Sequence, residues 1–227
     1  MLDVEVQTAP QPGLRHGIYS YREAARLLGV ASQRVSRWAD GYVFQLKYGQ
    51  GKSRPVLQTE RHPGVLSFAE LFELFFVREY VGLGVPLQHV RATAEALARE
   101  FGPYPFSRSE VLIGGRELLV KNAEGLLRRP DVGQLVADYA EWMVKQVQFR
   151  QEVVGRYSPP EFDDQVFLDR EIRGGEAVVT EFAIPTRVIY SLWVREKDMS
   201  VVAAYHDIPV GSVSLAVRYE AQWRLAA

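Results

Sequence analysis

The hydrophobic pattern near the N-terminus switches from helical spacing to strand alternation, which restricts the fold more than any other feature of the chain. Ser20 stands three residues before Glu23, the spacing of a capping box, so the sequence predicts a helix that starts at Tyr21. Gly29 can adopt the left-handed conformation that ends a helix. After a short turn, Ser32 is expected to cap a second helix. Two short helices joined in this way form a helix-turn-helix.

The next segment, residues 42–58, alternates apolar and polar side chains as a β-strand does. A Gly49-Gln50-Gly51 run interrupts the alternation and indicates the turn of a β-hairpin. Pro55 cannot donate a hydrogen bond to a sheet, so its strand is expected at an edge. On the second helix, Val35 and Trp38 face the first helix. The order helix, turn, helix, hairpin predicts a winged helix-turn-helix.

Two longer helices are expected after the hairpin. Ser67 and Glu70 form a second capping box before an apolar helix over residues 68–81, which Gly82 ends. Pro86 suits the first turn of a helix over residues 86–101. This helix carries one apolar stripe and ends at Gly102, and the stripe consists of Val90, Ala94, Leu97 and Phe101.

The centre of the chain gives weaker signals. Residues 109–120 read as a hairpin with Gly114-Gly115 at its turn. Residues 131–147 read as a helix, and residues 151–166 as a linker and domain boundary. The expected helix would bury Leu135, Val136, Tyr139 and Met143.

The C-terminal segment predicts three helices. Pro185 starts the first, Met199-Ser200 starts a short second, and the third runs from Val210 to about Trp223. The expected fold class is therefore mainly α with small β-hairpins, combining an N-terminal winged helix-turn-helix with a C-terminal three-helix domain that is itself helix-turn-helix-like. Four divisions are expected. Residues 1–17 form a flexible arm, and residues 18–102 form a DNA-binding domain. Residues 103–155 form a connecting region of β-hairpin and helix, and residues 156–227 form a tail domain.

Charge is distributed unevenly along the 227 residues, whose formal net charge is −1. Residues 15–62 carry nine Lys or Arg and three Asp or Glu, a surplus of +6, so the remainder carries −7. A basic head on an acidic body indicates that a polyanion binds at the head alone.

The second helix of a helix-turn-helix enters the DNA major groove. Arg34 and Arg37 are three residues apart on that helix, so they share its outer face. Arginine and glutamine read base edges, whereas serine, lysine and the glycine-containing hairpin suit phosphates. The predicted DNA contacts are Arg22, Ser32, Gln33, Arg34, Ser36, Arg37, Lys47, Lys52 and Arg54. The alternative is a solvated basic surface, which is the commoner explanation for any one arginine.

Residues 18–101, with the motifs YSYREAARLLGVASQRVSRWADGY and LSFAELFELFFVREYVGLGVPLQHVRATAEAL, resemble a MerR-type DNA-binding domain. Residues 178–221, with Ile184-Pro185-Thr186-Arg187-Val188, are similar to the small three-helix domain of VapB-like antitoxins. Related domains often carry Gly-Thr where Phe182-Ala183 stands here. The resemblance implies a dimer that binds operator DNA as a repressor and captures a PIN-like ribonuclease toxin.

Residues 185–222 carry four basic and four acidic side chains, so this unit lacks the surplus charge of the head. It is rich in aromatic residues, which are favoured at protein interfaces. The predicted toxin contacts are Tyr190, Trp193, Arg187 and Trp223. The alternative is that most of these aromatic side chains fill the core of a very small domain.

No pattern of catalytic or metal-binding chemistry was found. The chain has no cysteine, and its four histidines are isolated from other metal-ligand residues. The acidic pair Asp163-Asp164 is typical of a solvated linker, and the chain has no phosphate-binding loop or nucleophile elbow. The expectation is a protein that is not an enzyme and binds no cofactor and no metal.

The N-terminus lacks the blocks of a signal peptide, and no apolar run approaches the ~20 residues that span a bilayer, so a cytoplasmic protein is expected. The leading hypothesis is an antitoxin that also represses its own operator. The alternative is a MerR-type transcriptional regulator whose C-terminal region binds a small ligand. A toxin gene beside this one would favour the first hypothesis.

Overall fold

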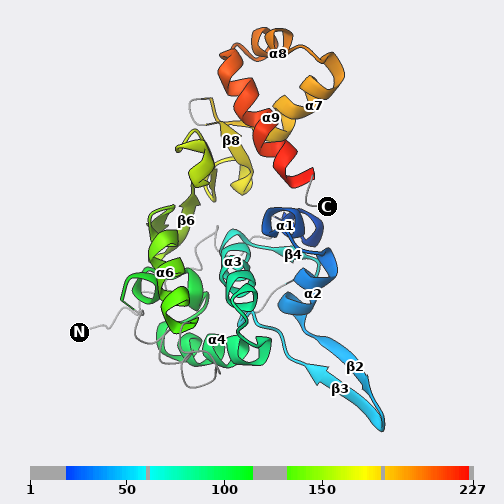
Figure 1. The fold of residues 1–227 in the computed structure, drawn as a ribbon, viewed down its shortest axis with the longest axis vertical. Coiled ribbons are helices and arrows are strands. Elements are labelled where there is room, and N and C mark those ends of the chain that lie inside the picture. The colour runs from blue at the N-terminus through cyan, green and yellow to red at the C-terminus, as the bar shows by residue number, and fades with distance from the viewer. Residues whose placement is uncertain (1–18, 60–61, 115–131, 180–181, 225–227) are drawn as a thin grey trace, which may run out of the picture.

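The computed structural model describes residues 19–59, 62–114, 132–179 and 182–224. Within them the chain is mostly helical, with small antiparallel sheets, which confirms the predicted fold class. An N-terminal unit, a central region of helices and sheet, and a C-terminal three-helix unit follow one another along the chain (Figure 1). The predicted arm over residues 1–17 lies outside the described residues.

The N-terminal unit begins as the capping signals predict. Ser20 accepts the backbone N–H of Glu23, the Glu23 carboxylate accepts that of Ser20, and Gly29 ends the helix in the left-handed conformation. Ser32 is not a cap, because Ala31 takes the extended N-cap conformation and Ser32 is already helical. The elements are β1 (Tyr19–Ser20), α1 (Tyr21–Leu28) and α2 (Ser32–Asp40), and β1 pairs with β4 (Val65–Leu66).

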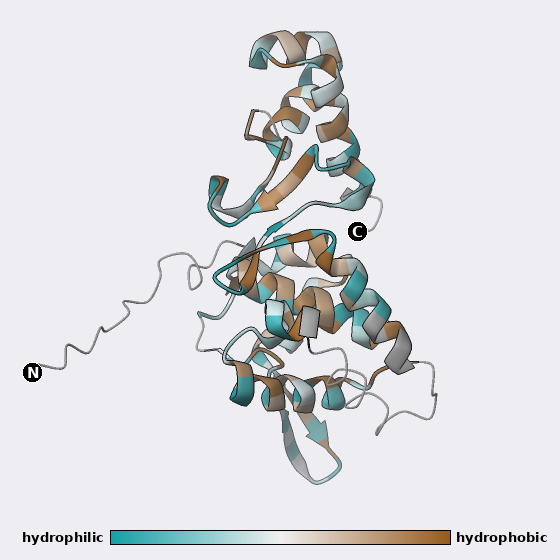
Figure 2. Ribbon diagram, turned by 90° about the vertical axis from the view of Figure 1, so that its left-hand side faces the viewer, coloured by the Kyte–Doolittle hydropathy of each residue, from teal (hydrophilic) through white to brown (hydrophobic). Residues whose placement is uncertain are grey.

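The predicted hairpin is confirmed as β2 (Tyr42–Leu46) paired with β3 (Gly49–Ser53), here called the wing. Its tip differs from the prediction, because Leu46 pairs with Gly49 and the turn is therefore formed by Lys47 and Tyr48. Gly51 serves another purpose: the Phe44 ring lies across it, and a Cβ there would collide with the ring. Pro55 follows β3 and does not lie within it. Figures 1 and 2 both show the wing projecting away from the body.

The central helix is α3 (Phe68–Gly82), whose residues 68–77 are all buried. Its predicted capping box forms between Ser67 and Glu70, although Gly82 is still helical and Leu83 is the C-cap. Beside it, α4 (Leu87–Phe101) buries its predicted apolar stripe and leaves only Phe101 partly exposed. Because α3 is enclosed on most sides, it fixes the position of the units packed around it.

The central region corrects two predictions. Residues 110–114 form a π-helix where a strand was expected, and the second half of that expected hairpin lies outside the described residues. The expected linker at 151–166 instead contributes to a five-stranded antiparallel sheet in the order β5-β6-β7-β8-β9. The strands are β5 (Val147–Arg150), β6 (Val153–Tyr157), β7 (Val166–Asp169), β8 (Ala177–Val179) and β9 (Ile184–Pro185).

The remaining helix of this region is α6 (Val132–Val144). Met143 is buried as predicted and Tyr139 partly so, but Leu135 is exposed, and the side chain of Val136 lies outside the described residues. Short helical turns connect the other elements, at Pro105–Ser107, Pro160–Phe162 and Arg173–Gly175.

The C-terminal unit has the three predicted helices and a core of its own. Its helices are α7 (Thr186–Glu196), α8 (Met199–His206) and α9 (Val210–Arg224). Ile189, Val202, Val213 and Ala216 are buried between them. Pro185 is the N-cap of α7, and Asp198 caps α8 by accepting backbone N–H groups of its first turn.

A buried polar contact, here called the seam, joins the N-terminal and C-terminal units. Arg26 of α1 lies 3.3 Å from the carboxylate of Glu220 on α9, which also accepts the hydroxyl of Thr186 at 2.7 Å. Nearby, the Tyr19 hydroxyl donates to the carbonyl of Gly175 at 2.5 Å. The two units therefore meet through specific polar groups.

Among the described residues, no single helix has the length and apolarity to cross a membrane. The pair α8 and α9 meets that criterion together by length and composition only, and the pair is bent by 111° at its break.

Candidate nucleic-acid interface

Helix α2 presents a polar face to solvent because its apolar residues pack inward. Val35, Trp38 and Ala39 are buried against the rest of the N-terminal unit. Arg34 and Arg37 lie on the opposite, exposed side, as their spacing predicts. Among the described residues no side chain caps the helix at Ala31, although the amide of Arg34 already donates to the Ala31 carbonyl at 2.8 Å.

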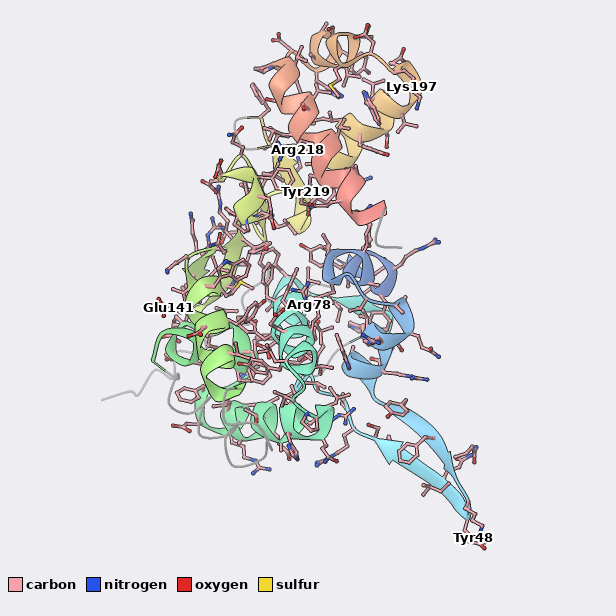
Figure 3. The ribbon with its side chains drawn as sticks, in the orientation of Figure 1. Tyr48, Arg78, Glu141, Lys197, Arg218 and Tyr219 are labelled. Atoms are coloured by element: carbon pink, nitrogen blue, oxygen red, sulfur yellow. The ribbon has the colours of Figure 1, made fainter. Side chains whose placement is uncertain are left out.

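The wing has two chemically different faces. Val43 pairs with Lys52 and Gln45 with Gln50, which gives a largely polar face that includes one cation. Tyr42, Phe44 and Leu46 alternate onto the other face and are all exposed. Tyr48 stands at the tip of the wing (Figure 3) and is 86% exposed. Lys47 lies over its ring at 5.5 Å from the centre. The polar face and the tip are the parts of the wing suited to phosphates.

A contact between α2 and the wing holds these two surfaces together. The guanidinium of Arg37 lies 5.2 Å from the centre of the Tyr42 ring, at the base of the wing. Arg54, which follows the wing, instead forms an ion pair with Glu95 of α4 at 3.5 Å. Both arginines are therefore held by the protein itself, and Arg54 would have to leave Glu95 to bind a phosphate.

The predicted DNA contacts all lie in the N-terminal unit. Every one is exposed except Ser36, which is half-buried. Sequence reasoning missed Arg91 on α4, which interacts electrostatically with Tyr42 and Arg54, and whose pKa is lowered by burial. The buried Nε and Nη2 of Arg91 have no hydrogen-bond partner among the described residues. The neighbouring Val90 belongs to the apolar stripe, which indicates only that α4 faces the core. Nothing in the local sequence links α4 to the wing, so Arg91 gave no signal.

Three of the predicted toxin contacts, Arg187, Tyr190 and Trp193, lie along α7. Arg187 forms a two-point ion pair with Glu176, with N–O distances of 2.9 and 2.7 Å, and this pairing raises the pKa of Arg187. The rings of Tyr190 and Trp193 are 5.5 Å apart and both are half-buried. The side chain of Trp223 lies outside the described residues.

Sequence reasoning also missed an apolar surface on α8. Val201 and Tyr205 are one helical turn apart, so they share a face, and they are 48% and 74% exposed. Tyr205 is one of the aromatic residues that mark this unit in the sequence, although it is not among the predicted toxin contacts. Val201 did not stand out, because an exposed and a buried apolar residue look alike at short helical spacing. This face of α8 carries no ionised side chain between them, unlike the outer face of α2.

Residues 17–94 match the family described as "Putative DNA-binding HTH domain". The chain therefore contains a helix-turn-helix domain of the DNA-binding type, in agreement with the geometry of α1, α2 and the wing. The match ends within α4 and includes the predicted DNA contacts.

One curated relative is "Putative antitoxin VapB45" of Mycobacterium tuberculosis strain H37Rv, which is 27% identical over 112 residues. That match covers 47% of this chain and 47% of the relative, so the chain spans about half the length of the curated relative it matches. The X-ray crystal structure of Rv2018 from Mycobacterium tuberculosis superposes with a TM-score of 0.69 at 19% sequence identity, over 90% of this chain and 99% of that one. The likeness to that structure shows a shared fold.

Proposed function

We propose that this protein is the antitoxin of a type II toxin-antitoxin pair, which binds operator DNA and neutralises a PIN-like ribonuclease toxin. The observation that carries the proposal is the pairing of two surfaces in one chain. A DNA-binding helix-turn-helix with exposed arginines is joined to a three-helix unit without surplus charge and with exposed apolar side chains. The similarity to a mycobacterial antitoxin supports the same conclusion.

The DNA-binding part acts as a MerR-like winged helix-turn-helix. Helix α2 enters the major groove, where Arg34 and Arg37 contact base edges. Lys47 and Lys52 of the wing neutralise phosphates on the adjacent backbone. The protein binds as a homodimer on a two-fold operator and represses its own transcription.

The toxin-binding part is the C-terminal unit. Its contact surface includes the predicted residues on α7, chiefly Trp193, and extends to the exposed apolar face of α8 at Tyr205. A bulky, half-buried aromatic residue beside exposed apolar groups is typical of the centre of a protein interface. Arg187 contributes less, because it would have to exchange its ion pair with Glu176.

Co-expression with the small protein encoded by a neighbouring gene tests both halves of the proposal. The expected result is that the neighbour alone stops growth and cleaves RNA, and that this chain restores growth and co-purifies with the neighbour. The purified complex should bind the promoter fragment upstream of the gene pair. If no neighbouring protein is toxic or forms a complex, toxin neutralisation is wrong, whereas DNA binding is judged separately.

The alternative, a MerR-type regulator with a small-ligand-binding region, is favoured by one observation. A cavity lined by aromatic side chains lies where the N-terminal unit, the central region and α9 meet.

A further inference from the structure

The cavity encloses about 160 Å³. It is bounded by α1, α3, α6, α9 and the segment from β6 to β7, so the N-terminal unit, the central region and the C-terminal unit each contribute to its wall. A dry cavity of about 150 Å³ in another protein holds one benzene molecule, so a single aromatic ring is the size that fits here. The lining residues that matter below are Phe75, Arg78, Tyr139, Trp142, Tyr157 and Glu161.

Aromatic rings form the walls of the cavity. Tyr139 and Trp142 are stacked, with centroids 5.6 Å apart and planes inclined by 29°. Tyr157 lies 5.7 Å from Phe75, the next ring along the wall. Trp142 is 39% exposed, which places it at the entrance of the cavity. Flat, closely packed rings offer their faces to another planar ring.

A cation and an anion lie at different positions on this wall. The Arg78 guanidinium is half-buried, stands 5.4 Å from the Phe75 ring, and donates to the carbonyl of Leu28 at 3.3 Å and to Glu79 at 3.2 Å. A guanidinium has five N–H donors, so these two bonds leave further donors for a ligand. Glu161 supplies an exposed carboxylate elsewhere on the wall. Figure 3 labels Arg78 on α3, beside α1.

The two phenols of the wall are hydrogen-bond donors at neutral pH. Burial raises the pKa of both hydroxyls, and that of Tyr157 reaches about 12, with Glu161 as the second cause. Protonated phenols can donate to an acceptor on a bound molecule, and the Glu161 carboxylate can accept from a donor. The polar groups thus distinguish one end of a ligand from the other.

We propose that this cavity binds a small aromatic carboxylate that carries a hydroxyl or amino group on its ring. The carboxylate binds Arg78, the ring lies against Trp142 and Tyr139, and the ring substituent donates to Glu161. A neutral hydrocarbon would cover the remaining N–H donors of the guanidinium without bonding to them, and an aromatic amine without a carboxylate would be repelled by its charge. The proposal concerns a site apart from the DNA and toxin surfaces and does not depend on toxin capture.

The position of Arg78 links this site to the DNA-binding helices. Leu28, whose carbonyl Arg78 holds, is the last residue of α1 and precedes the turn at Gly29 that leads to α2. A ligand carboxylate that binds the remaining donors would draw on the same guanidinium that holds this carbonyl. The turn between α1 and α2 is therefore held differently when the cavity is occupied and when it is empty. A ligand that interacts differently with two conformations shifts the equilibrium between them.

Isothermal titration calorimetry on the full chain, without DNA or toxin, tests the proposal with para-hydroxybenzoate as the probe. The expected result is saturable binding with a Kd below about 1 mM, and binding at least tenfold weaker for phenol and for benzylamine. Trp142→Ala and Arg78→Gln should each weaken binding of para-hydroxybenzoate at least tenfold. Trp193→Ala removes the same side chain from α7, away from the cavity, and should bind as the unmodified chain does.

Circular dichroism checks that each variant is folded, and Trp142→Ala replaces a residue that is partly exposed. The proposal is overturned if para-hydroxybenzoate does not bind, if phenol binds equally well, or if folded Trp142→Ala retains full affinity. Any of these results leaves the proposed antitoxin function intact, because promoter binding and toxin capture are measured in separate experiments.

Discussion

The N-terminal and C-terminal units are both built from short helices joined by tight turns, yet they present opposite surfaces. On α2, Arg34 and Arg37 stand on the exposed side of a helix whose apolar face is buried. On α8, the exposed side carries Val201 and Tyr205. Helix-turn-helix geometry thus fixes which residues face outward, whereas the chemistry of those residues decides whether the partner is DNA or protein.

The largest expected effect comes from removing the two arginines of α2. Arg34→Ala combined with Arg37→Ala should weaken binding to the operator by about 1–3 kcal/mol for each base that an arginine reads. Fluorescence anisotropy with a labelled promoter fragment measures this change. The matched control is Arg195→Ala with Arg218→Ala in the C-terminal unit, which removes the same charge and should leave the affinity unchanged. Equal reductions in affinity for the two double variants would mean that total charge, and not α2, determines binding.

The reciprocal variant is Trp193→Ala in the C-terminal unit. It should weaken toxin binding by about 2 kcal/mol, because large aromatic residues at the centre of interfaces contribute that much. Surface plasmon resonance with immobilised toxin measures the change, and anisotropy should show unchanged operator binding. Unchanged toxin affinity would exclude Trp193 from the interface.

The seam tests how independent the two units are. Arg26→Met leaves the carboxylate of Glu220, which is 3% exposed, without its cation and should lower the free energy of unfolding. Because Arg26 is partly exposed and Thr186 still donates to Glu220, the expected decrease is about 1–2 kcal/mol, less than for a fully buried pair.

Urea denaturation measures that decrease, and the cycle is completed with Glu220→Gln and the double variant. A positive coupling energy between the two positions is expected. Strict additivity would show that the ion pair contributes nothing to holding the units together.

The smallest effect is expected from the wing. Lys52→Ala should reduce the slope of log affinity against log salt concentration by about one unit, because one phosphate would no longer be neutralised by the protein. Gln50→Ala, on the same polar face but uncharged, is the control and should keep the slope. A wild-type slope for Lys52→Ala would place the wing away from the DNA backbone.

The sequence predicts the two helical units well because their signals are local. Capping boxes at Ser20 and Ser67, and a left-handed glycine at position 29, depend only on neighbours in the chain, and the structure shows each of them. The one-residue error at Ser32 arises because the N-cap depends on backbone conformation as well as on side-chain type. Local rules therefore locate helices but not always their first residue.

The central sheet could not be predicted because its signals are long-range. Strand β7 is buried along its whole length, including Asp169, so it shows no alternation of apolar and polar residues. The charge of Asp169 is met by Arg150 on β5, with N–O distances of 2.6 and 2.7 Å. In the sequence, Asp169 therefore looks like a further acidic residue of a solvated linker that contains Asp163-Asp164. The contact of Arg54 with Glu95 and the place of Arg91 beside the wing were hidden for the same reason.

Of the three parts of the molecule, the N-terminal unit alone is expected to bind DNA. Photochemical crosslinking of the full chain to its promoter fragment, followed by mass spectrometry of the linked peptides, tests it most directly. Crosslinks should be confined to peptides from α1, α2 and the wing, within residues 21–54. Crosslinks concentrated on α7 to α9 would contradict it, because the C-terminal unit would then be a DNA-binding surface.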